Sequence, residues 1–239
     1  MLESLNQLDH HVFSAINGVA GEFRGLDRVI VFIRDSYIAK GIPVMMIWWG
    51  LWFDQRPGAR QTREGLLAAL AVSIVAIFVG RLLALTLPFR DRPIHDAAME
   101  VIVPVGARAE TLMGWSSFPS DHAVLFFSLA TGIFLVNRIM GGILLFHAVT
   151  IISLPRIYSG LHFPGDILFG ALIGVVVTLL AFSFFKTLAY RLNALSIAER
   201  HAHIFYPVLF FITFQTASMF DSSRDLVNFL YAAARALGT

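Results

Sequence analysis

Long apolar stretches separated by short polar segments recur along the chain from residue 37 onward. A helix needs about 20 mostly apolar residues to cross the roughly 30 Å hydrocarbon core of a bilayer. Stretches of about this length predict spanning helices near 37–53, 65–87, 120–136, 140–154, 164–185 and 204–220. The interval 88–119 is too polar to be embedded and is expected to lie outside the membrane. The pattern therefore predicts an all-α polytopic membrane bundle of about six transmembrane helices.

The two ends of the chain show a different pattern. Residues 8–36 alternate apolar stretches with charged residues, which is typical of one or two amphipathic helices at the membrane interface. The tail, residues 221–237, resembles them, and no internal repeat or low-complexity linker divides the chain. We expect one membrane-embedded domain over residues 1–239, with a motif core at about 81–166. The first 20 residues lack a basic start and a long apolar run, so no cleavable signal peptide is expected.

Composition supports a membrane protein and excludes several other classes. Hydrophobic residues make up 57% of the chain and charged residues 14%, against roughly 45–50% and about 25% in soluble proteins. The absence of cysteine excludes disulfides, iron–sulfur clusters and thiolate zinc sites. With a net charge of only +2 and scattered basic residues, no nucleic-acid partner is expected. The distribution of basic residues leaves the membrane orientation open. Basic residues counted in the loops between spans favour one orientation, and a count that also includes the terminal segments favours the other.

Three polar clusters fall at ends of predicted spans, all on the same face of the membrane. Polar residues gathered at one face among apolar helices indicate a functional site. The clusters are Arg90-Asp91-Arg92-Pro93, Pro119-Ser120-Asp121-His122, and Arg156 with His162 and Asp166.

The second cluster has the character of a helix start. Ser120 is a good N-cap, and the backbone N–H groups of Asp121 and His122 would be among the unpaired donors of the first turn. Such a helix end suits a bound phosphate. The alternative is a plain capped helix with His122 as an interfacial residue.

The third cluster combines a histidine, a carboxylate and a guanidinium. Pro164 suits the first position of a helix, which places His162 just outside that helix and Asp166 in its first turn. The carboxylate could then accept a hydrogen bond from one imidazole nitrogen and make the other a better nucleophile. Arg156 supplies a planar fork suited to phosphate.

Two kinds of chemistry compete for these residues. Two histidines and one aspartate could bind a divalent metal, or they could carry out phosphoryl transfer with arginines as an electrostatic clamp. Several arginines would repel a metal ion, whereas they would stabilise the charge of a phosphoryl group. The sequence also lacks the H-E-x-x-H zinc signature. We therefore expect a metal-independent enzyme without a cofactor.

At this point the chain resembles the type 2 phosphatidic acid phosphatase superfamily, whose signature reads K-x6-R-P, P-S-G-H and S-R-x5-H-x3-D. The resemblance covers about residues 37–220. The three parts here read Leu85-x6-Arg92-Pro93, Pro119-Ser120-Asp121-His122 and Pro155-Arg156-x5-His162-x3-Asp166.

The resemblance implies a role for each matching residue. His162 would be the nucleophile that forms a phosphohistidine, His122 would protonate the leaving group, and Asp166 would orient the nucleophile. The phosphate would be held by Arg92, Arg156, Ser120 and backbone N–H groups near Asp121.

The chain departs from the family pattern at three positions. Asp121 replaces the common Gly, Pro155 replaces the Ser before the arginine, and Leu85 replaces the Lys. The last change removes a phosphate-binding cation. Arg90, in the motif loop, is the better replacement, and Arg81, one helical turn before Leu85, could also reach the site.

The resemblance is greatest to bacterial undecaprenyl-diphosphate phosphatases, which implies hydrolysis of a lipid phosphate or diphosphate. Phosphatidic acid or phosphatidylglycerol phosphate is the alternative substrate, and a non-hydrolytic lipid-binding or transport protein is the alternative class. The resemblance also implies a multi-pass protein of the bacterial inner membrane, with its active site facing the periplasm or exterior. The bilayer and a lipid phosphate are the expected partners. The sequence leaves the preferred lipid and the oligomeric state open.

Overall fold

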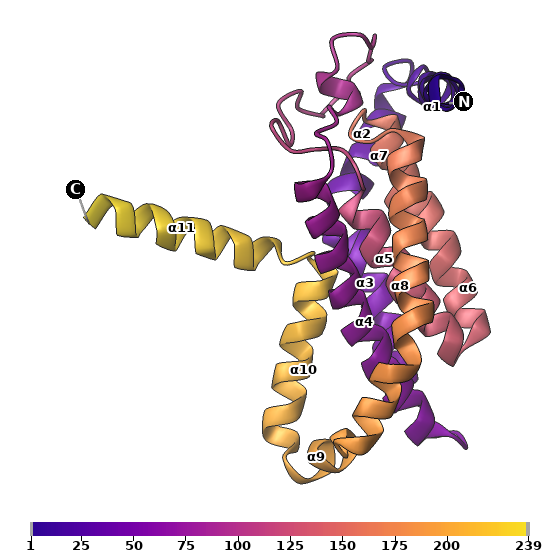
Figure 1. Cartoon of the computed structure of the whole chain (residues 1–239), viewed down its shortest axis with the longest axis vertical. Coiled ribbons are helices and arrows are strands. Elements are labelled where there is room, and N and C mark those ends of the chain that lie inside the picture. The colour runs from indigo at the N-terminus through magenta and orange to yellow at the C-terminus, as the bar shows by residue number, and fades with distance from the viewer. Residues whose placement is uncertain (1, 238–239) are drawn as a thin grey trace.

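The computed structural model describes residues 2–237, and within this range the chain forms helices and loops only (Figure 1). The helices build an elongated bundle, from whose side α11 projects. Their bounds are α1 Leu2–Asn17, α2 Arg24–Asp35, α3 Tyr37–Trp52, α4 Ala59–Thr86, η1 Pro93–His95, α5 Asp121–Val136, α6 Arg138–His147, η2 Ala148–Ser153, α7 Leu154–Tyr158, α8 Pro164–Arg191, α9 Ala194–Arg200, α10 Ala202–Ala217 and α11 Asp221–Leu237.

The centre of the bundle consists of α4, α5 and α8, which make the most extensive contacts with one another. The largest apolar core lies where α3, α4, α5, α6 and α10 meet. Trp48, Trp52, Leu66, Leu125 and Leu129 are completely or almost completely buried there. These apolar side chains on facing helices account for the helical bundle that the hydrophobic pattern predicted.

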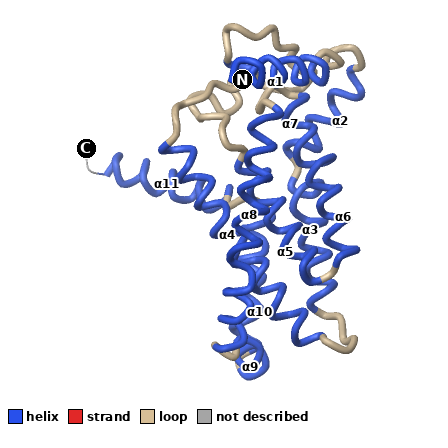
Figure 2. The backbone as a smooth tube through the Cα atoms, turned by 45° about the vertical axis from the view of Figure 1, so that its right-hand side comes forward, coloured by secondary structure: helices blue, strands red, loops and turns tan. Residues whose placement is uncertain are grey.

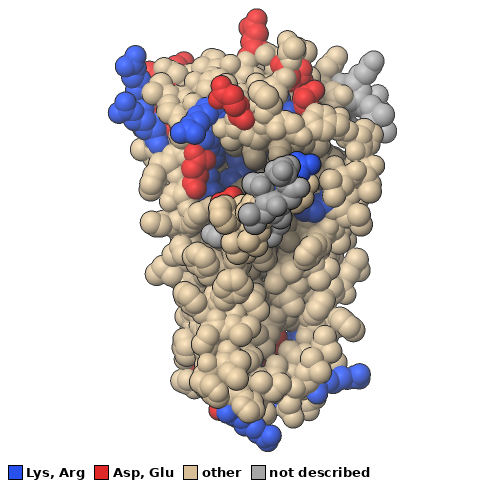
Figure 3. Space-filling model, turned by 90° about the vertical axis from the view of Figure 1, so that its left-hand side faces the viewer, with Lys and Arg blue, Asp and Glu red and all other residues tan. Residues whose placement is uncertain are grey.

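Three helical segments are long and apolar enough to cross a membrane: Ala59–Thr86, Arg138–Tyr158 and Pro164–Arg191. Asp121–Val136 and Ala202–Ala217 are shorter apolar helices. Figure 3 shows charged side chains gathered toward the two ends of the visible face, with a broad belt largely free of charge between them. Such a belt is expected where lipid surrounds the bundle. The structure thus has the character of an all-α membrane protein.

The helix that contains α6, η2 and α7 continues to Tyr158, beyond the predicted end of the fourth span near residue 154. Pro155 lies inside it and supplies no backbone N–H to the helix. The preceding η2 is a π-helical stretch, a form that adjusts the hydrogen-bond register within a helix. Arg156 Nη1 donates to the Ile152 carbonyl at 2.9 Å and supports the same turn. Arg156 is therefore held on a helix rather than on a loop.

The helices α1 and α2 cover one end of the bundle together with the loop of residues 87–120 (Figure 2); this end is called the site end. The buried Asp27 carboxylate accepts hydrogen bonds from Tyr158 Oη at 2.5 Å and from the Val105 N–H at 2.9 Å. Burial raises the pKa of Asp27, but these hydrogen bonds and one from the Gly21 N–H outweigh burial and lower the pKa. Asn17 also bonds to the Tyr158 carbonyl at 2.8 Å. These bonds fasten the N-terminal helices and the loop to α7.

The helices α5 and α8 approach closely at Gly170 and Gly174. A Cβ atom at position 170 would lie 2.7 Å from the Ser120 carbonyl oxygen, and one at position 174 would collide with the Val124 carbonyl. A hydrogen bond of 2.7 Å between the hydroxyls of Ser128 and Thr178 links the same two helices. Small residues at this spacing allow the contact. It sets the start of α5 beside the start of α8.

Gly174→Ala is expected to lower the free energy of unfolding by about 1–3 kcal/mol, because the added Cβ meets backbone atoms that cannot move independently of α5. Thermal unfolding of the detergent-solubilised protein measures this effect. Gly142→Ala on α6 is the control, since a Cβ there meets nothing within 4 Å and alanine favours a helix by about 1 kcal/mol. Equal unfolding midpoints for the two variants would contradict the close packing of α5 on α8.

Candidate active site

A cavity of about 250 Å³ lies at the site end of the bundle. Its walls carry two histidines, five basic side chains and three carboxylates. These are His122 and His162; Arg34, Lys40, Arg81, Arg92 and Arg156; and Asp35, Asp121 and Asp221. Residues from the second and third motifs, and Arg92 from the first, therefore meet at one cavity, as their positions at span ends predicted.

The hydrogen bonds around His162 define its tautomer. Its Nδ1 lies 2.9 Å from the Ser117 carbonyl oxygen, which can only accept a hydrogen bond. Its Nε2 lies 3.2 Å from Arg92 Nη1, which can only donate. Nδ1 therefore carries the proton, and the lone pair of Nε2 faces the guanidinium. Burial lowers the pKa of His162 to about 4, although the nearby Asp166 opposes this shift, so the imidazole is neutral near pH 7.

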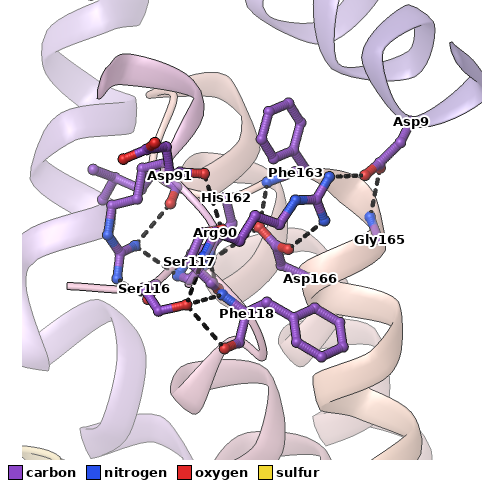
Figure 4. A network of polar contacts seen from close by, with 12 residues as sticks. Asp9, Arg90, Asp91, Ser116, Ser117, Phe118, His162, Phe163, Gly165 and Asp166 are labelled. Carbon is purple, nitrogen blue, oxygen red and sulfur yellow. Dashed lines mark hydrogen bonds and ion pairs between the residues drawn. The ribbon is translucent and has the colours of Figure 1, made fainter. Parts of the chain in front are cut away.

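Asp166 lies behind His162 at the start of α8 (Figure 4). Its Oδ2 is 3.7 Å from His162 Nδ1 and accepts a hydrogen bond of 2.8 Å from the Phe163 N–H. Its Oδ1 accepts a hydrogen bond of 2.7 Å from Arg90 Nη1. The carboxylate thus stabilises the first turn of α8. At 3.7 Å it is too far from Nδ1 for the hydrogen bond expected from the sequence, and the Ser117 carbonyl orients the imidazole instead.

Arg90 is held by two carboxylates on the same side of the site. Besides Asp166, it contacts Asp9 Oδ2 on α1 at 2.8 Å, and its guanidinium lies 4.3 Å from the centre of the Phe163 ring. The other oxygen of Asp9 accepts a hydrogen bond of 2.6 Å from the Gly165 N–H. Arg90 is not among the described residues that line the cavity. In the structure Arg90 therefore contacts Asp166 and Asp9 rather than the cavity.

Two buried arginines form the cationic wall of the cavity. Arg92 donates to the Leu161 carbonyl at 2.7 Å and to the Ser116 carbonyl at 3.2 Å, and Arg156 donates to the Ile152 carbonyl. Burial lowers the pKa of Arg92 to about 10, so it remains charged near pH 7. Since these hydrogen bonds end on neutral carbonyl oxygens, they orient the guanidinium groups without neutralising their charge.

The start of α5 brings the second motif to the cavity. Ser120 is the N-cap residue by position, but its buried Oγ makes no capping bond and has no hydrogen-bond partner among the described residues. The Ser120 side chain is absent from the described cavity lining, whereas Asp121 and His122 belong to it. The Asp121 carboxylate pairs with Arg81 Nη2 at 2.7 Å, and the Arg81 guanidinium lies 4.9 Å from the Trp115 ring centre. Arg81 thus reaches the site from α4.

Leu85, at the position of the family lysine, is not among the described residues that line this cavity and is 83% exposed. It lines a neighbouring cavity of about 610 Å³ together with Leu87 and Phe89. Arg81 and Trp115 line both cavities, so the two adjoin. An apolar surface therefore leads directly to the cationic site.

Several residues of this site were not identified from the sequence. Asp9 and Arg34 belong to helices whose charged residues fit the polar face of an amphipathic segment, and Lys40 lies near the end of an apolar stretch. None of them lies in a recognisable motif. Only the tertiary fold brings them to the site.

The chain is similar in sequence to several known bacterial proteins. The chain is 26% identical over 179 residues to undecaprenyl-diphosphatase BcrC of Bacillus subtilis (strain 168), covering 74% of this chain and 84% of the relative. It is 29% identical over 199 residues to putative undecaprenyl-diphosphatase YbjG of Escherichia coli (strain K12), covering 80% and 88%. It is 28% identical over 206 residues to a protein named bacitracin transport permease protein BcrC, from Bacillus licheniformis, covering 82% and 90%.

The fold is similar to that in the crystal structure of LpxE from Aquifex aeolicus, with a TM-score of 0.50 and 23% identity. The match covers 72% of this chain and 93% of that one. The apolar helices and the bacterial relatives together indicate a bacterial membrane protein. The sequence model of the PAP2 superfamily matches residues 65–190, more than half of the chain, so the protein belongs to this superfamily of type 2 phosphatidic acid phosphatases, as its three motifs implied.

Proposed function

We propose that this chain, a lipid phosphatase of the PAP2 superfamily, hydrolyses a lipid diphosphate, with undecaprenyl diphosphate favoured, through a phosphohistidine at His162. The observation that carries the proposal is the neutral His162 imidazole, whose unprotonated Nε2 lies 3.2 Å from Arg92 Nη1 at the wall of a cation-lined cavity. Two of the relatives described above are named as undecaprenyl-diphosphatases, one of them putatively. Phosphatidic acid or phosphatidylglycerol phosphate is the alternative substrate.

In the first step, His162 Nε2 attacks the terminal phosphorus of the diphosphate. A nitrogen–phosphorus bond forms as the bond from phosphorus to the bridging oxygen breaks, and the electron pair passes to that oxygen. His122, which lines the same cavity, supplies a proton to the leaving group. Arg92 and Arg156 stabilise the charge on the transferring group, and Asp166 stabilises the imidazolium character that develops on His162.

In the second step, water attacks the phosphorus of the phosphohistidine. His122 accepts a proton from this water, reversing its earlier role, and the nitrogen–phosphorus bond breaks. Inorganic phosphate leaves, and His162 returns to its neutral form. The products are one inorganic phosphate and one lipid monophosphate for each diphosphate and water consumed.

The adjoining apolar cavity supports a lipid substrate. Leu85, Leu87 and Phe89 provide a surface for a hydrocarbon chain beside the cationic head-group site. A long isoprenoid chain could remain in the bilayer while its diphosphate enters the cavity, so the substrate need not leave the membrane. We propose that the site end faces the periplasm or exterior of the inner membrane.

A non-hydrolytic transport role is the alternative of another class, and one relative carries the name of a transport permease. A transport site needs to bind and release its ligand, but it does not need an activated nucleophile. The orientation of His162 by the Ser117 carbonyl, with the Asp166 carboxylate nearby, favours hydrolysis. Release of phosphate from a lipid diphosphate separates the two functions.

Purified protein is expected to release phosphate from undecaprenyl diphosphate in EDTA, because guanidinium groups supply the positive charge that a metal would otherwise supply. A panel with phosphatidic acid and phosphatidylglycerol phosphate establishes the preferred substrate. Vanadate should inhibit, since it can adopt the five-coordinate geometry of transfer to His162. Activity that is lost in chelator and restored by Mg²⁺ would contradict this mechanism.

The fall of kcat/KM at acidic pH, its acid limb, should reflect the protonation of His162. Because its pKa is lowered to about 4 and the neutral form attacks, activity should persist through mildly acidic pH and fall as pH approaches about 4. The nearby Asp166 raises the pKa of His162, so Asp166→Asn should move the acid limb to lower pH while reducing kcat. Rates measured between pH 3.5 and pH 8 test this prediction, because the pH profile of kcat/KM reports the ionisation of groups in the free enzyme. An acid limb that stayed in place in Asp166→Asn would be inconsistent with it.

Arg90→Ala is expected to reduce kcat about tenfold with a smaller change in KM, because Arg90 orients Asp166 and does not line the cavity. Asp9→Asn, which weakens the ion pair that holds Arg90 from α1, should also reduce kcat, but by a smaller factor. Arg108→Ala, an exposed change in the same loop, is the control. A rise in KM with unchanged kcat in Arg90→Ala would instead indicate direct phosphate binding.

A further inference from the structure

Two buried cations outside the three motifs also line the active-site cavity. Arg34, in the last turn of α2, and Lys40, in the first turn of α3, are only 4% and 5% exposed. Burying charged side chains costs free energy unless opposite charge or hydrogen bonds compensate. Intramembrane or membrane-proximal cations directed to a cavity are therefore candidates for binding an anionic ligand.

Hydrogen bonds and ion pairs within the protein compensate the positive charge of these two side chains only in part. Arg34 Nε and Nη2 each donate to Asp35 at 2.7 Å, but the buried Nη1 has no hydrogen-bond partner among the described residues. The Lys40 Nζ lies 5.2 Å from the centre of the Tyr37 ring, and no ion pair of Lys40 occurs in the described part of the chain. Donor capacity thus remains for a ligand.

The carboxylates of the cavity are already engaged elsewhere. Asp35 pairs with Arg34, Asp121 pairs with Arg81, and Asp221 accepts a hydrogen bond of 2.5 Å from Tyr37 Oη. The lining residues include more cations than carboxylates. If Arg92 and Arg156 hold the terminal phosphate, Lys40 and the unbonded Nη1 of Arg34 remain for a second anionic group.

Lys40, Arg34 and His122 line the same cavity. Because His122 is the proposed acid for the leaving group, cations of this cavity other than Arg92 and Arg156 are available to the inner phosphate of a bound diphosphate.

We propose that Arg34 and Lys40 form a subsite for the inner phosphate of a lipid diphosphate, and that this subsite makes the enzyme prefer diphosphates to monophosphates. This inference rests on the proposed function. When the bridging bond breaks, the electron pair remains on the oxygen of the inner phosphate, and the two cations stabilise that charge. A lipid monophosphate has no inner phosphate, so its alkoxide leaving group depends on the proton from His122 alone.

The test compares farnesyl diphosphate with farnesyl monophosphate, which share one hydrocarbon chain. Phosphate release by the purified full-length protein gives kcat/KM for each. In Lys40→Met and in Arg34→Gln, the ratio of the diphosphate value to the monophosphate value should fall about ten- to hundredfold, the size expected for a lost charge-assisted hydrogen bond. Lys186→Met replaces the only other lysine of the chain, toward the far end of α8, and should leave the ratio as in the wild type.

A second pair of variants separates charge from folding. Lys40→Arg and Arg34→Lys keep the charge and should retain most of the preference for diphosphate. Thermal unfolding shows which variants are folded. If Lys40→Met does not fold, inhibition measurements decide the question. Farnesyl methylenediphosphonate should inhibit the wild-type enzyme more tightly than farnesyl phosphonate does, and this difference should be smaller in Arg34→Gln.

Equal losses on the two substrates would overturn the proposal, because they would place Lys40 and Arg34 on the terminal phosphate or assign them a purely structural role. In that case the proposed hydrolysis itself would stand. Failure of the folded wild-type protein to release phosphate from farnesyl or undecaprenyl diphosphate would instead overturn the proposed function, and the subsite with it.

Discussion

The close packing of α5 on α8 is the constraint on which the site depends. Gly170 and Gly174 allow the two helix backbones to meet, and the Ser120 N–H then donates to the Asp166 carbonyl at 3.2 Å. The two helix starts that carry His122 and Asp166 are thereby placed side by side. A larger residue at either glycine would separate them, so the relative position of His122 and Asp166 follows from helix packing. The loop carbonyl of Ser117 then orients His162 beside them.

Burial away from water determines the charge state of His162 and the strength of the field from the arginines beside it. Burial keeps His162 neutral, and its hydrogen bonds direct the unprotonated Nε2 toward Arg92, so in the proposed mechanism His162 attacks without a separate deprotonation step. The same burial strengthens the field of Arg92 and Arg156, whose hydrogen bonds end on uncharged carbonyl oxygens. An anionic ligand is therefore the natural counter-charge of the cavity. Of the carboxylates that line the cavity, Asp35 pairs with Arg34 and Asp121 pairs with Arg81.

The sequence predicted the helical bundle and the gathering of the motif residues at one end of it better than it predicted the supporting contacts. Apolar periodicity located the helices because the core is built from long runs such as Ala59–Thr86, and the motifs located His122 and His162 because each lies at a helix end. The role of Arg90 depends on Asp9, which is distant in the chain, and no local pattern indicates that contact. The same holds for Arg34 and Lys40, which only the fold of α2 and α3 brings to the cavity.

The most direct test of the central claim is to identify the atom that receives the phosphoryl group. Rapid quenching of the enzyme with a lipid diphosphate labelled at its terminal phosphate, followed by peptide mapping under alkaline conditions, should show an acid-labile phosphate on His162. His162→Ala should show neither the label nor turnover. Phosphorylation of another residue, or steady turnover by His162→Ala at the wild-type rate, would contradict the account.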